Sequence, residues 1–276
     1  MALLCPFRAY RYDPRIVGDL ALVATQPYDK ISPVLQEEYY RRSLHNVIRV
    51  TRSLEKRDNP ETDYPDAART LQSWIDQGVL VQDPVPGFYA YCQRYDFEGE
   101  KLLRTGLVAL LDLQHSAAGI LPHERTLVEP KMDRLRLLRS IECNEDMVFT
   151  IYTEDKLKVN RILEDTTAAR RPEIDVKDDF GAVHRLWTIG DPKSIRKIQE
   201  GMVPEELFIA DGQHRVESAL AYKRECEARG WKPAAESFAS RMVDCPSCQL
   251  HVLNVVIFQS FFHPLYLEER SKRLRF

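Results

Sequence analysis

The stretch that decides the fold is "ELFIADGQHRVESALAYK", Glu206 to Lys223. It begins with apolar, β-prone residues, passes through Asp-Gly, and continues with apolar residues at helical spacing. The pattern predicts a buried strand, a tight turn and an amphipathic helix. Polar side chains that bind charge or move protons gather at the join: Asp211, Gln213, His214 and Arg215.

These residue types suit an anion-binding turn. The first backbone N–H groups of a helix and its dipole attract anions, and the guanidinium of Arg215 has the fork geometry that fits phosphate or carboxylate. His214 can donate a proton near neutral pH, and Asp211 can hold a metal ion or accept a proton from a hydroxyl. The alternative is an N-cap aspartate with an exposed His and Arg on a surface helix. A cation beside a helix N-terminus is unfavourable unless an anion is present, which favours the binding site.

Composition narrows the class of protein. The chain has 276 residues, 44% of them hydrophobic, with 39 basic against 42 acidic residues and a net charge of −3. A dedicated nucleic-acid-binding protein usually has a basic excess or stripe, which is missing here. The longest apolar stretch, around Val252 to Phe262, is roughly half of a membrane span. The amino terminus lacks a signal-peptide pattern, and six scattered cysteines indicate reduced thiols. We therefore expect a cytoplasmic protein without a membrane partner.

Hydrophobic periodicity predicts a mixed α+β chain, with a mixed sheet and flanking helices. "GFYAYCQRYDF" and "LLRTGLVALLDL", joined by a short polar connector, predict an antiparallel hairpin. The segment "VIRV", Val47 to Val50, predicts a short strand. Further helices are expected over residues 34–46, 64–78, 129–141 and 191–202, and further strands over residues 147–152 and 182–189.

Two other polar clusters are candidate sites. In "LPHERTL", a proline is followed by His123, Glu124, Arg125 and Thr126, and a predicted helix then carries Lys131, Asp133 and Arg134. The alternative is a charged loop and a solvated helix face, and Leu127 stands where a zinc protease would need its second histidine. In "PYDKIS", Tyr28 and Asp29 lie between prolines, either as a rigid ligand-facing loop or as a plain turn.

Several familiar motifs are missing from the sequence. It has no phosphate-binding loop of the P-loop type, no dinucleotide fingerprint and no nucleophile elbow. Cys245 and Cys248 have the spacing of half a zinc site, but no second pair follows at a suitable distance. We expect no structural zinc.

The blocks "QPYDKIS", "LPHERTL…PKMDRLRLLRS…N" and "IADGQHRVESALAY" resemble, in this order, the blocks of the DUF1015 family. The resemblance runs from about Pro6 to about Arg241. The usual third block reads D-G-H-H-R-Y, so Gln213 and Val216 depart from it. That block is in turn similar to the signature of the ParB/sulfiredoxin superfamily, which includes free-serine kinases. This more distant resemblance implies a ParB/sulfiredoxin-like element in which Asp211, Gly212, His214 and Arg215 surround a phosphoryl group.

The resemblance and the residue types together predict a phosphoryl-transfer enzyme, a kinase acting on serine or a related hydroxy-amino acid. It would use ATP or ADP with Mg²⁺, so its partners would be a nucleotide and a small molecule. The expected catalytic residues are Asp211, His214 and Glu124. The residues expected to bind substrate or phosphate are Gly212, Arg215, His123, Arg125, Tyr28, Asp29, Lys131 and Arg134. The alternatives are a non-catalytic nucleotide- or ligand-sensing module and, less favoured by the charge, a ParB-like nucleic-acid protein.

The domain organisation is expected to change near the carboxyl end. Residues 1–242 are predicted to form the family-like α+β region, with a subdomain boundary near residues 115–125. Residues 243–276 differ abruptly in composition and are expected to be an atypical tail from a truncated or frame-shifted reading frame.

Overall fold

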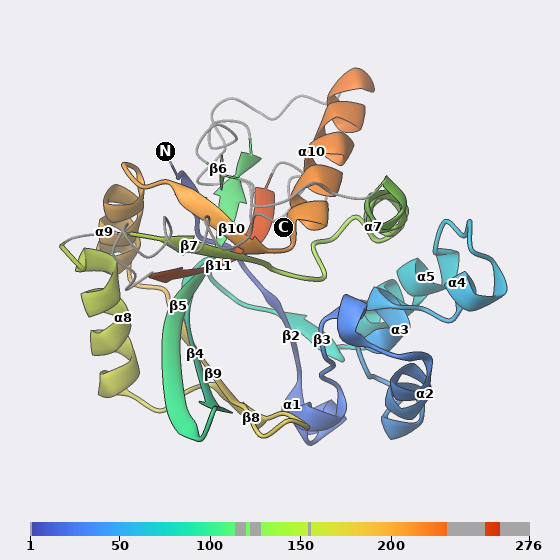
Figure 1. Cartoon of the computed structure of the whole chain (residues 1–276), viewed down its shortest axis with the longest axis horizontal. Coiled ribbons are helices and arrows are strands. Elements are labelled where there is room, and N and C mark those ends of the chain that lie inside the picture. The colour runs from blue at the N-terminus through green and yellow to red at the C-terminus, as the bar shows by residue number, and fades with distance from the viewer. Residues whose placement is uncertain (1, 114–119, 122–127, 154–155, 231–251, 260–276) are drawn as a thin grey trace.

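A computed structural model of the chain describes residues 2–113, 120–121, 128–153, 156–230 and 252–259. It shows a strongly bent sheet with helices on one side, and a group of short helices set beside the sheet (Figure 1). The predicted mixed α+β fold is confirmed. None of the described helices is long and apolar enough to cross a membrane.

The main sheet has nine strands and mixed pairing. Its order is β6-β10-β7-β11-β5-β4-β9-β8, and β1 pairs with β5 beside this path. The pairs β6–β10 and β7–β11 are parallel, and the other pairs are antiparallel. The strands are β1 (Leu4–Cys5), β4 (Phe88–Phe97), β5 (Glu100–Asp112), β6 (Ile120–Leu121), β7 (Val148–Tyr152), β8 (Ile174–Lys177), β9 (Val183–Ile189), β10 (Leu207–Asp211) and β11 (Val252–Gln259).

The β4–β5 hairpin is the prediction that the structure matches most closely. Phe97 pairs with Glu100, so a two-residue loop joins the strands. Glu98 and Gly99 both have positive φ angles, 51° and 84°, as tight hairpin turns between twisted strands require. The hairpin therefore forms where the sequence changes from β-prone residues to Glu-Gly.

The core lies between one face of the sheet and the helices α8 (Lys158–Ala169) and α9 (Pro192–Met202). Asp191 caps α9 by accepting a hydrogen bond from the Ser194 amide at 2.8 Å, and Pro192 follows at the first helical position. The main contributors to this core are Phe88, Ala90, Leu107, Ala109, Leu111, Val159, Leu163, Ile198 and Met202.

A group of short helices precedes the hairpin and lies to one side of the sheet (Figure 1). A two-stranded sheet, β2–β3, lies between this group and the main sheet in the same view. The elements are β2 (Tyr10–Tyr12), α1 (Pro14–Val17), η1 (Leu20–Leu22), η2 (Tyr28–Lys30), α2 (Pro33–Arg42), α3 (Ile48–Thr51), α4 (Glu55–Asp58), α5 (Pro65–Asp76) and β3 (Leu80–Gln82).

The prediction of a strand over Val47–Val50 is wrong, because Ile48–Thr51 forms the helix α3. Asn46 is fully buried, and its side chain accepts a hydrogen bond from the Ile48 amide at 3.0 Å. The same side chain donates to the Leu22 carbonyl at 2.8 Å. A local asparagine turn, anchored by tertiary contacts, thus overrides the β propensity of three apolar residues.

Two longer helices, α7 (Val128–Ile141) and α10 (Gln213–Ala228), pack together on the side of β10 and β7 (Figure 1). Leu135 of α7 and Tyr222 and Cys226 of α10 form a small buried cluster between them. Arg139 pairs with Glu225 at 2.6 Å across the same interface. These contacts hold the C-terminal half of α10 against α7.

Strands from before and after residues 115–125 belong to the same main sheet. Strand β11 lies beyond residue 242 and is hydrogen-bonded to both β5 and β7 within that sheet. The predicted subdomain boundary and the predicted reading-frame origin of residues 243–276 stay predictions. Cys245 and Cys248 lie outside the described residues.

Candidate functional site

The opening stretch folds as a strand, a turn and a helix. Strand β10 ends at Asp211, α10 begins at Gln213, and Gly212 joins them with φ 92° and ψ 26°. The pairing of β10 with β7 shifts register between Ile209 and Asp211, which marks an irregularity just before the turn. No side chain in the described part of the chain caps the first turn of α10. The 16-residue helix α10 therefore starts at this turn with backbone N–H groups that no described side chain caps.

Gly212 is required at this turn for two reasons. Its φ lies in the left-handed region, where a side chain is strained. A Cβ atom there would also lie 2.8 Å from Nη1 of Arg215 and 3.3 Å from the Cα atom of Val148. Glycine thus lets Arg215 fold back across the turn and lets α10 approach β7.

Arg215 is held by carboxylates and a carbonyl on two elements. Its Nη2 donates to Asp211 at 3.2 Å, and its Nη1 donates to the carbonyl of Met147. Its Nε lies 3.2 Å from Asp146 without hydrogen-bond alignment and contributes as an ion pair. The side chain is only 11% exposed, whereas that of Asp211 is 54% exposed. Asp211 is therefore the partner that an entering anion would displace most easily.

Arg134 forms the second cationic centre, and it is buried. Asp133 accepts from its Nη2 at 2.8 Å and from its Nε at 3.2 Å. Its Nη1 donates to the Thr51 carbonyl at 2.9 Å and to Glu145 at 3.3 Å. Burial opposes the charged form of Arg134, but Glu145 and Asp133 outweigh it and raise the pKa of the guanidinium. Arg134 therefore stays charged in the interior.

Asp133 connects this centre to the helices α4 and α5. Besides Arg134, its carboxylate accepts a hydrogen bond from the Tyr64 hydroxyl at 2.6 Å and pairs with Lys56 at 2.7 Å. Burial acts to raise the pKa of Asp133, but Arg134, Lys56 and Tyr64 together lower it below its usual value. Asp133 is therefore ionised, and its carboxylate is bound by Arg134, Tyr64 and Lys56.

The ring of Tyr28 contacts both guanidinium groups. The Arg134 guanidinium carbon lies 4.4 Å from the ring centroid, and that of Arg215 lies 5.8 Å from it. Arg52 holds this loop in place by donating to the carbonyls of Tyr28, at 2.7 Å, and Ile31. Three sequence blocks separated by about a hundred residues each therefore meet at one aromatic ring, as cation–π pairs.

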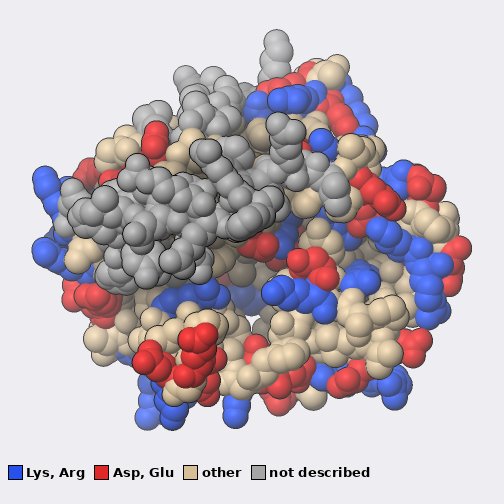
Figure 2. All heavy atoms as spheres, viewed as in Figure 1, with Lys and Arg blue, Asp and Glu red and all other residues tan. Residues whose placement is uncertain are grey.

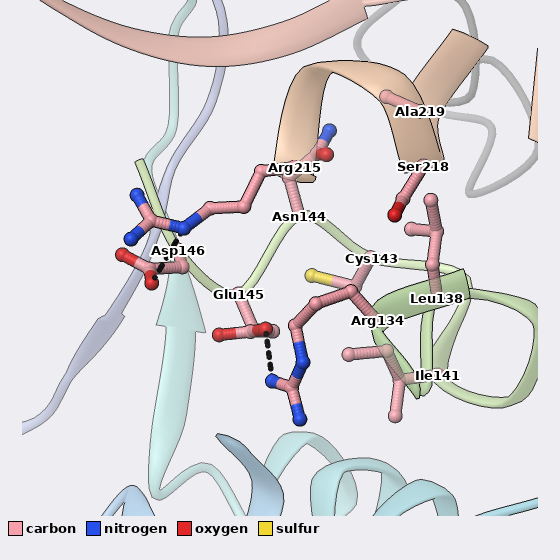
Figure 3. Close-up of a pocket in the computed structure, with 10 residues that line it drawn as sticks. All are labelled: Arg134, Leu138, Ile141, Cys143, Asn144, Glu145, Asp146, Arg215, Ser218 and Ala219. Carbon is pink, nitrogen blue, oxygen red and sulfur yellow. Dashed lines mark hydrogen bonds and ion pairs between the residues drawn. The ribbon is translucent and has the colours of Figure 1, made fainter. Parts of the chain in front are cut away.

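A small pocket opens between the two arginines, with a volume of about 40 Å³, or room for roughly three waters. The Arg215–Asp146 pair and the Arg134–Glu145 pair lie one above the other at its rim (Figure 3). Burial raises the pKa of Glu145 to about 7, Arg134 opposes the rise, and Asp146 adds to it. The lining residues are Arg134, Leu138, Ile141, Cys143, Asn144, Glu145, Asp146, Arg215, Ser218 and Ala219.

The structure brings together only part of the predicted site. Tyr28, Arg134, Asp211, Gly212 and Arg215 converge, with His214 half-buried in the first turn of α10. Asp29 is exposed on the loop beside Tyr28. The predicted residues His123, Glu124 and Arg125 lie outside the described residues.

Lys131 lies away from the pocket and braces two helices. Its ammonium group lies 3.3 Å from Glu217 of α10, and its carbonyl accepts the Ser218 hydroxyl at 2.9 Å. Gln213 and Val216, the two residues that depart from the D-G-H-H-R-Y block, are both buried. The two contacts of Lys131 join α7 to α10, so this residue contributes to the packing of the two helices.

The sequence did not single out the carboxylates and the donors that complete the site. Glu145 and Asp146 follow α7 as a plain "NED" loop, and Lys56, Tyr64 and Arg52 carried no motif of their own. One physical signal was available: two arginines predicted to share one site require nearby carboxylates when no ligand is bound. That signal predicts acidic partners without saying which ones.

The surface around the site is electrostatically mixed. Blue and red spheres alternate over the described part of the face in Figure 2, and no broad basic stripe crosses it. Among the described residues, no group of three or more candidate metal ligands is found. By residue type, the guanidinium groups of Arg215 and Arg134 suit a compact anion, and the raised pKa of the Glu145 carboxyl suits proton transfer.

No curated protein and no solved structure matches this chain. Residues 4–255 match the sequence profile of a family described as "Protein of unknown function (DUF1015)". The matched range includes every residue of the site and reaches into strand β11. The chain therefore belongs to the DUF1015 family.

Proposed function

We propose that the protein is a phosphotransferase that moves a phosphoryl group between a nucleotide, ATP or ADP, and a small hydroxyl compound such as serine. One observation carries the proposal: Arg134 and Arg215 converge on the Tyr28 ring at the uncapped start of α10. Phosphoryl transfer depends mainly on positioning and on neutralising the charge of the phosphate, and this arrangement supplies both.

In this proposal the phosphate binds at the start of α10. The helix dipole and the guanidinium of Arg215 attract it, and Asp211 swings away from Arg215 as the anion enters. The 54% exposure of the Asp211 side chain supports such a movement. Arg134 remains fixed by Asp133 and supplies a constant positive field.

Mg²⁺ would arrive with the nucleotide. Such ions usually take one or two protein carboxylates together with phosphate oxygens, so a preformed cage is unnecessary. Asp211, once released from Arg215, is the carboxylate that would hold it.

The described cysteines Cys5, Cys92, Cys143 and Cys226 form no disulfide, which suits the reducing cytoplasm in which we place the protein.

The test is phosphoryl transfer from radiolabelled ATP or ADP, with Mg²⁺, to serine. Arg215→Ala should lower the rate by about 10²–10³-fold, because it removes a cation that stabilises the transferring group. Arg224→Ala is the matched control, since Arg224 is an exposed arginine on the same helix. Thermal melts of both variants monitor folding. Equal rates for wild type and Arg215→Ala would refute the proposal.

The second candidate is a sensing module that binds a nucleotide or another small anion without turnover. The observation in its favour is that both arginines are already paired with carboxylates around a pocket of only about 40 Å³. Ligand entry must therefore rearrange the site, as a sensor requires. Calorimetric binding of nucleotide, with no transfer to any of a panel of amino acids, would favour this candidate.

A further inference from the structure

Glu145 is the carboxylate of the site that shares its guanidinium nitrogen with a backbone carbonyl. Within the described part of the chain, it accepts a hydrogen bond from Nη1 of Arg134 at 3.3 Å, and that nitrogen also donates to the Thr51 carbonyl at 2.9 Å. Asp133 takes the other two nitrogens of the same guanidinium. Asp133 also pairs with Lys56, and the hydrogen bond from Arg134 to Glu145 is the longest of the four that this guanidinium makes.

Glu145 is also less exposed than the other acidic groups at the pocket. Its side chain is 15% exposed, compared with 28% for Asp146 and 54% for Asp211. Water screens the charge of the other two carboxylates better, and Arg215 pairs with both of them. A proton entering this cluster is therefore held most favourably on Glu145.

The position of Glu145 fits a role in the reaction. Its carboxylate lines the pocket and lies at the rim below the Arg215–Asp146 pair (Figure 3). A hydroxyl placed in the pocket beside a phosphate on Arg215 would lie among Glu145, Asn144 and Ser218. Of the two carboxylates that line the pocket, Glu145 and Asp146, Glu145 is the less exposed one and is therefore the better proton acceptor.

We propose that Glu145 accepts the proton of the hydroxyl group that receives the phosphoryl group. This inference rests on the proposed function. In the step, the hydroxyl oxygen forms a bond to the terminal phosphorus of the nucleotide. The bond from that phosphorus to the bridging oxygen breaks, and its electron pair leaves with the nucleotide. The hydroxyl proton moves to Glu145, which afterwards releases it to water.

The acid–base balance of Glu145 supports this role. Burial raises the pKa of its carboxyl to about 7, so near neutral pH it can both accept and release a proton. Asp211, predicted from the sequence as the acceptor, is exposed and is paired with Arg215. Asp211 would in this proposal bind the metal ion, and proton transfer would belong to Glu145.

The test compares Glu145→Gln with the wild type and with Glu142→Gln in the transfer assay between pH 5.5 and 9. Glu142 is an exposed glutamate three residues earlier and does not line the pocket. Wild type and Glu142→Gln should show kcat rising with pH to a plateau, around an apparent pKa of about 7. Glu145→Gln should lose that rise and lower kcat on the order of 10²–10⁴-fold, with KM nearly unchanged.

A direct titration separates the proton transfer from a merely structural role. Carboxyl-carbon NMR of glutamate-labelled protein should show one resonance titrating near neutral pH, absent in Glu145→Gln and present in Glu142→Gln. If the wild type transfers phosphate but Glu145→Gln keeps its rate and pH profile, the inference fails and the proposed function stands. If the wild type transfers nothing, the proposed function fails and takes this inference with it.

Discussion

At the scale of single residues, Gly212 shows how one backbone position controls the chemistry of the site. Its positive φ redirects the chain between β10 and α10, and its missing side chain leaves room for the Arg215 guanidinium. Gly230, at the other end of α10, has a similar φ of 82°, but the space that a Cβ atom would occupy there is open. A substitution at Gly230 therefore measures backbone strain alone, and one at Gly212 measures backbone strain together with a steric clash.

We predict that Gly212→Ala destabilises the protein more than Gly230→Ala does. Gly230→Ala should cost about 1–2 kcal/mol of unfolding free energy, from the left-handed backbone alone. Gly212→Ala should cost a further 1–3 kcal/mol, because its methyl group meets Arg215 and the Val148 backbone. Urea unfolding of both variants measures the difference. Equal losses would contradict the placement of Arg215 across the turn.

Glu145 also predicts a pH dependence of stability. Its folded-state pKa of about 7 lies above the ordinary glutamate value of about 4.3, so the folded state binds the proton more tightly than the unfolded state. Stability from this group is therefore present below about pH 4.5 and is lost as pH rises to about 7. The glutamine in the Glu145→Gln variant cannot ionise, so this variant does not lose that stability as the pH rises.

Relative to wild type, Glu145→Gln should thus gain more than about 1 kcal/mol of unfolding free energy between pH 5 and pH 8, since one pKa unit is about 1.4 kcal/mol. Glu142→Gln should follow the wild type over the same range. Urea unfolding at the two pH values measures both. Parallel pH profiles for wild type and Glu145→Gln would show that Glu145 is ionised throughout.

At the scale of elements, α7 carries one arginine into the interior and another on its surface. Arg134 is 5% exposed and shares charges with Asp133 and Glu145, whereas Arg136 pairs with Glu61, which is 75% exposed. Leaving a buried cation or a buried carboxylate without its partner lowers the unfolding free energy strongly. A surface ion pair contributes little to it. The same helix therefore contains a strong anchor and a weak one.

Arg134→Met should lower the unfolding free energy by about 3–5 kcal/mol, because Asp133 and Glu145 would share the interior without their cation. Arg136→Ala should lower it by less than about 1 kcal/mol. Chemical denaturation of the two variants under identical conditions is the measurement. A comparable loss for both would mean that Arg134 is not buried.

Elements with strong local signals were predicted from the sequence, and sites built by long-range contacts were predicted only in part. The β4–β5 hairpin follows from Glu98-Gly99, and α9 follows from Asp191 and Pro192, because the deciding residues are neighbours in the chain. The α3 segment was mistaken for a strand, because the Asn46 side chain that starts its turn is held by a contact with the distant Leu22 carbonyl. Likewise, nothing local indicates that Glu145 faces Arg134.

At the scale of the whole molecule, strand β11 joins two parts of the sheet. It pairs with β5 from Val252 to Phe258 and with β7 from Val255 to Gln259. Without it, β6-β10-β7 and the remaining strands of the described sheet share no backbone ladder. The pairing of β11 with β7 is parallel and links distant parts of the chain, so no turn signal in the sequence could predict it.

A chain ended after residue 251 should therefore fail to give a soluble monomer, because the edges of β5 and β7 would be open to other chains. A chain ended after residue 260, which keeps the strand, is the matched control. Size-exclusion chromatography and far-UV circular dichroism of the two chains provide the comparison. A soluble, monomeric product ending at residue 251 would show that the two parts hold together without β11.

The position of β11 also has a consequence for how the protein is made. A ribosome releases α10 and the Arg215 turn well before it releases Val252 to Gln259. During that interval the nascent chain has two partial sheets with unpaired edges, the kind of surface that chaperones bind. Strand β11 is the last of the described strands to be synthesised, and it pairs with β7, which follows the loop that carries Glu145 and Asp146; we therefore expect the site to reach its final form after β11 is inserted.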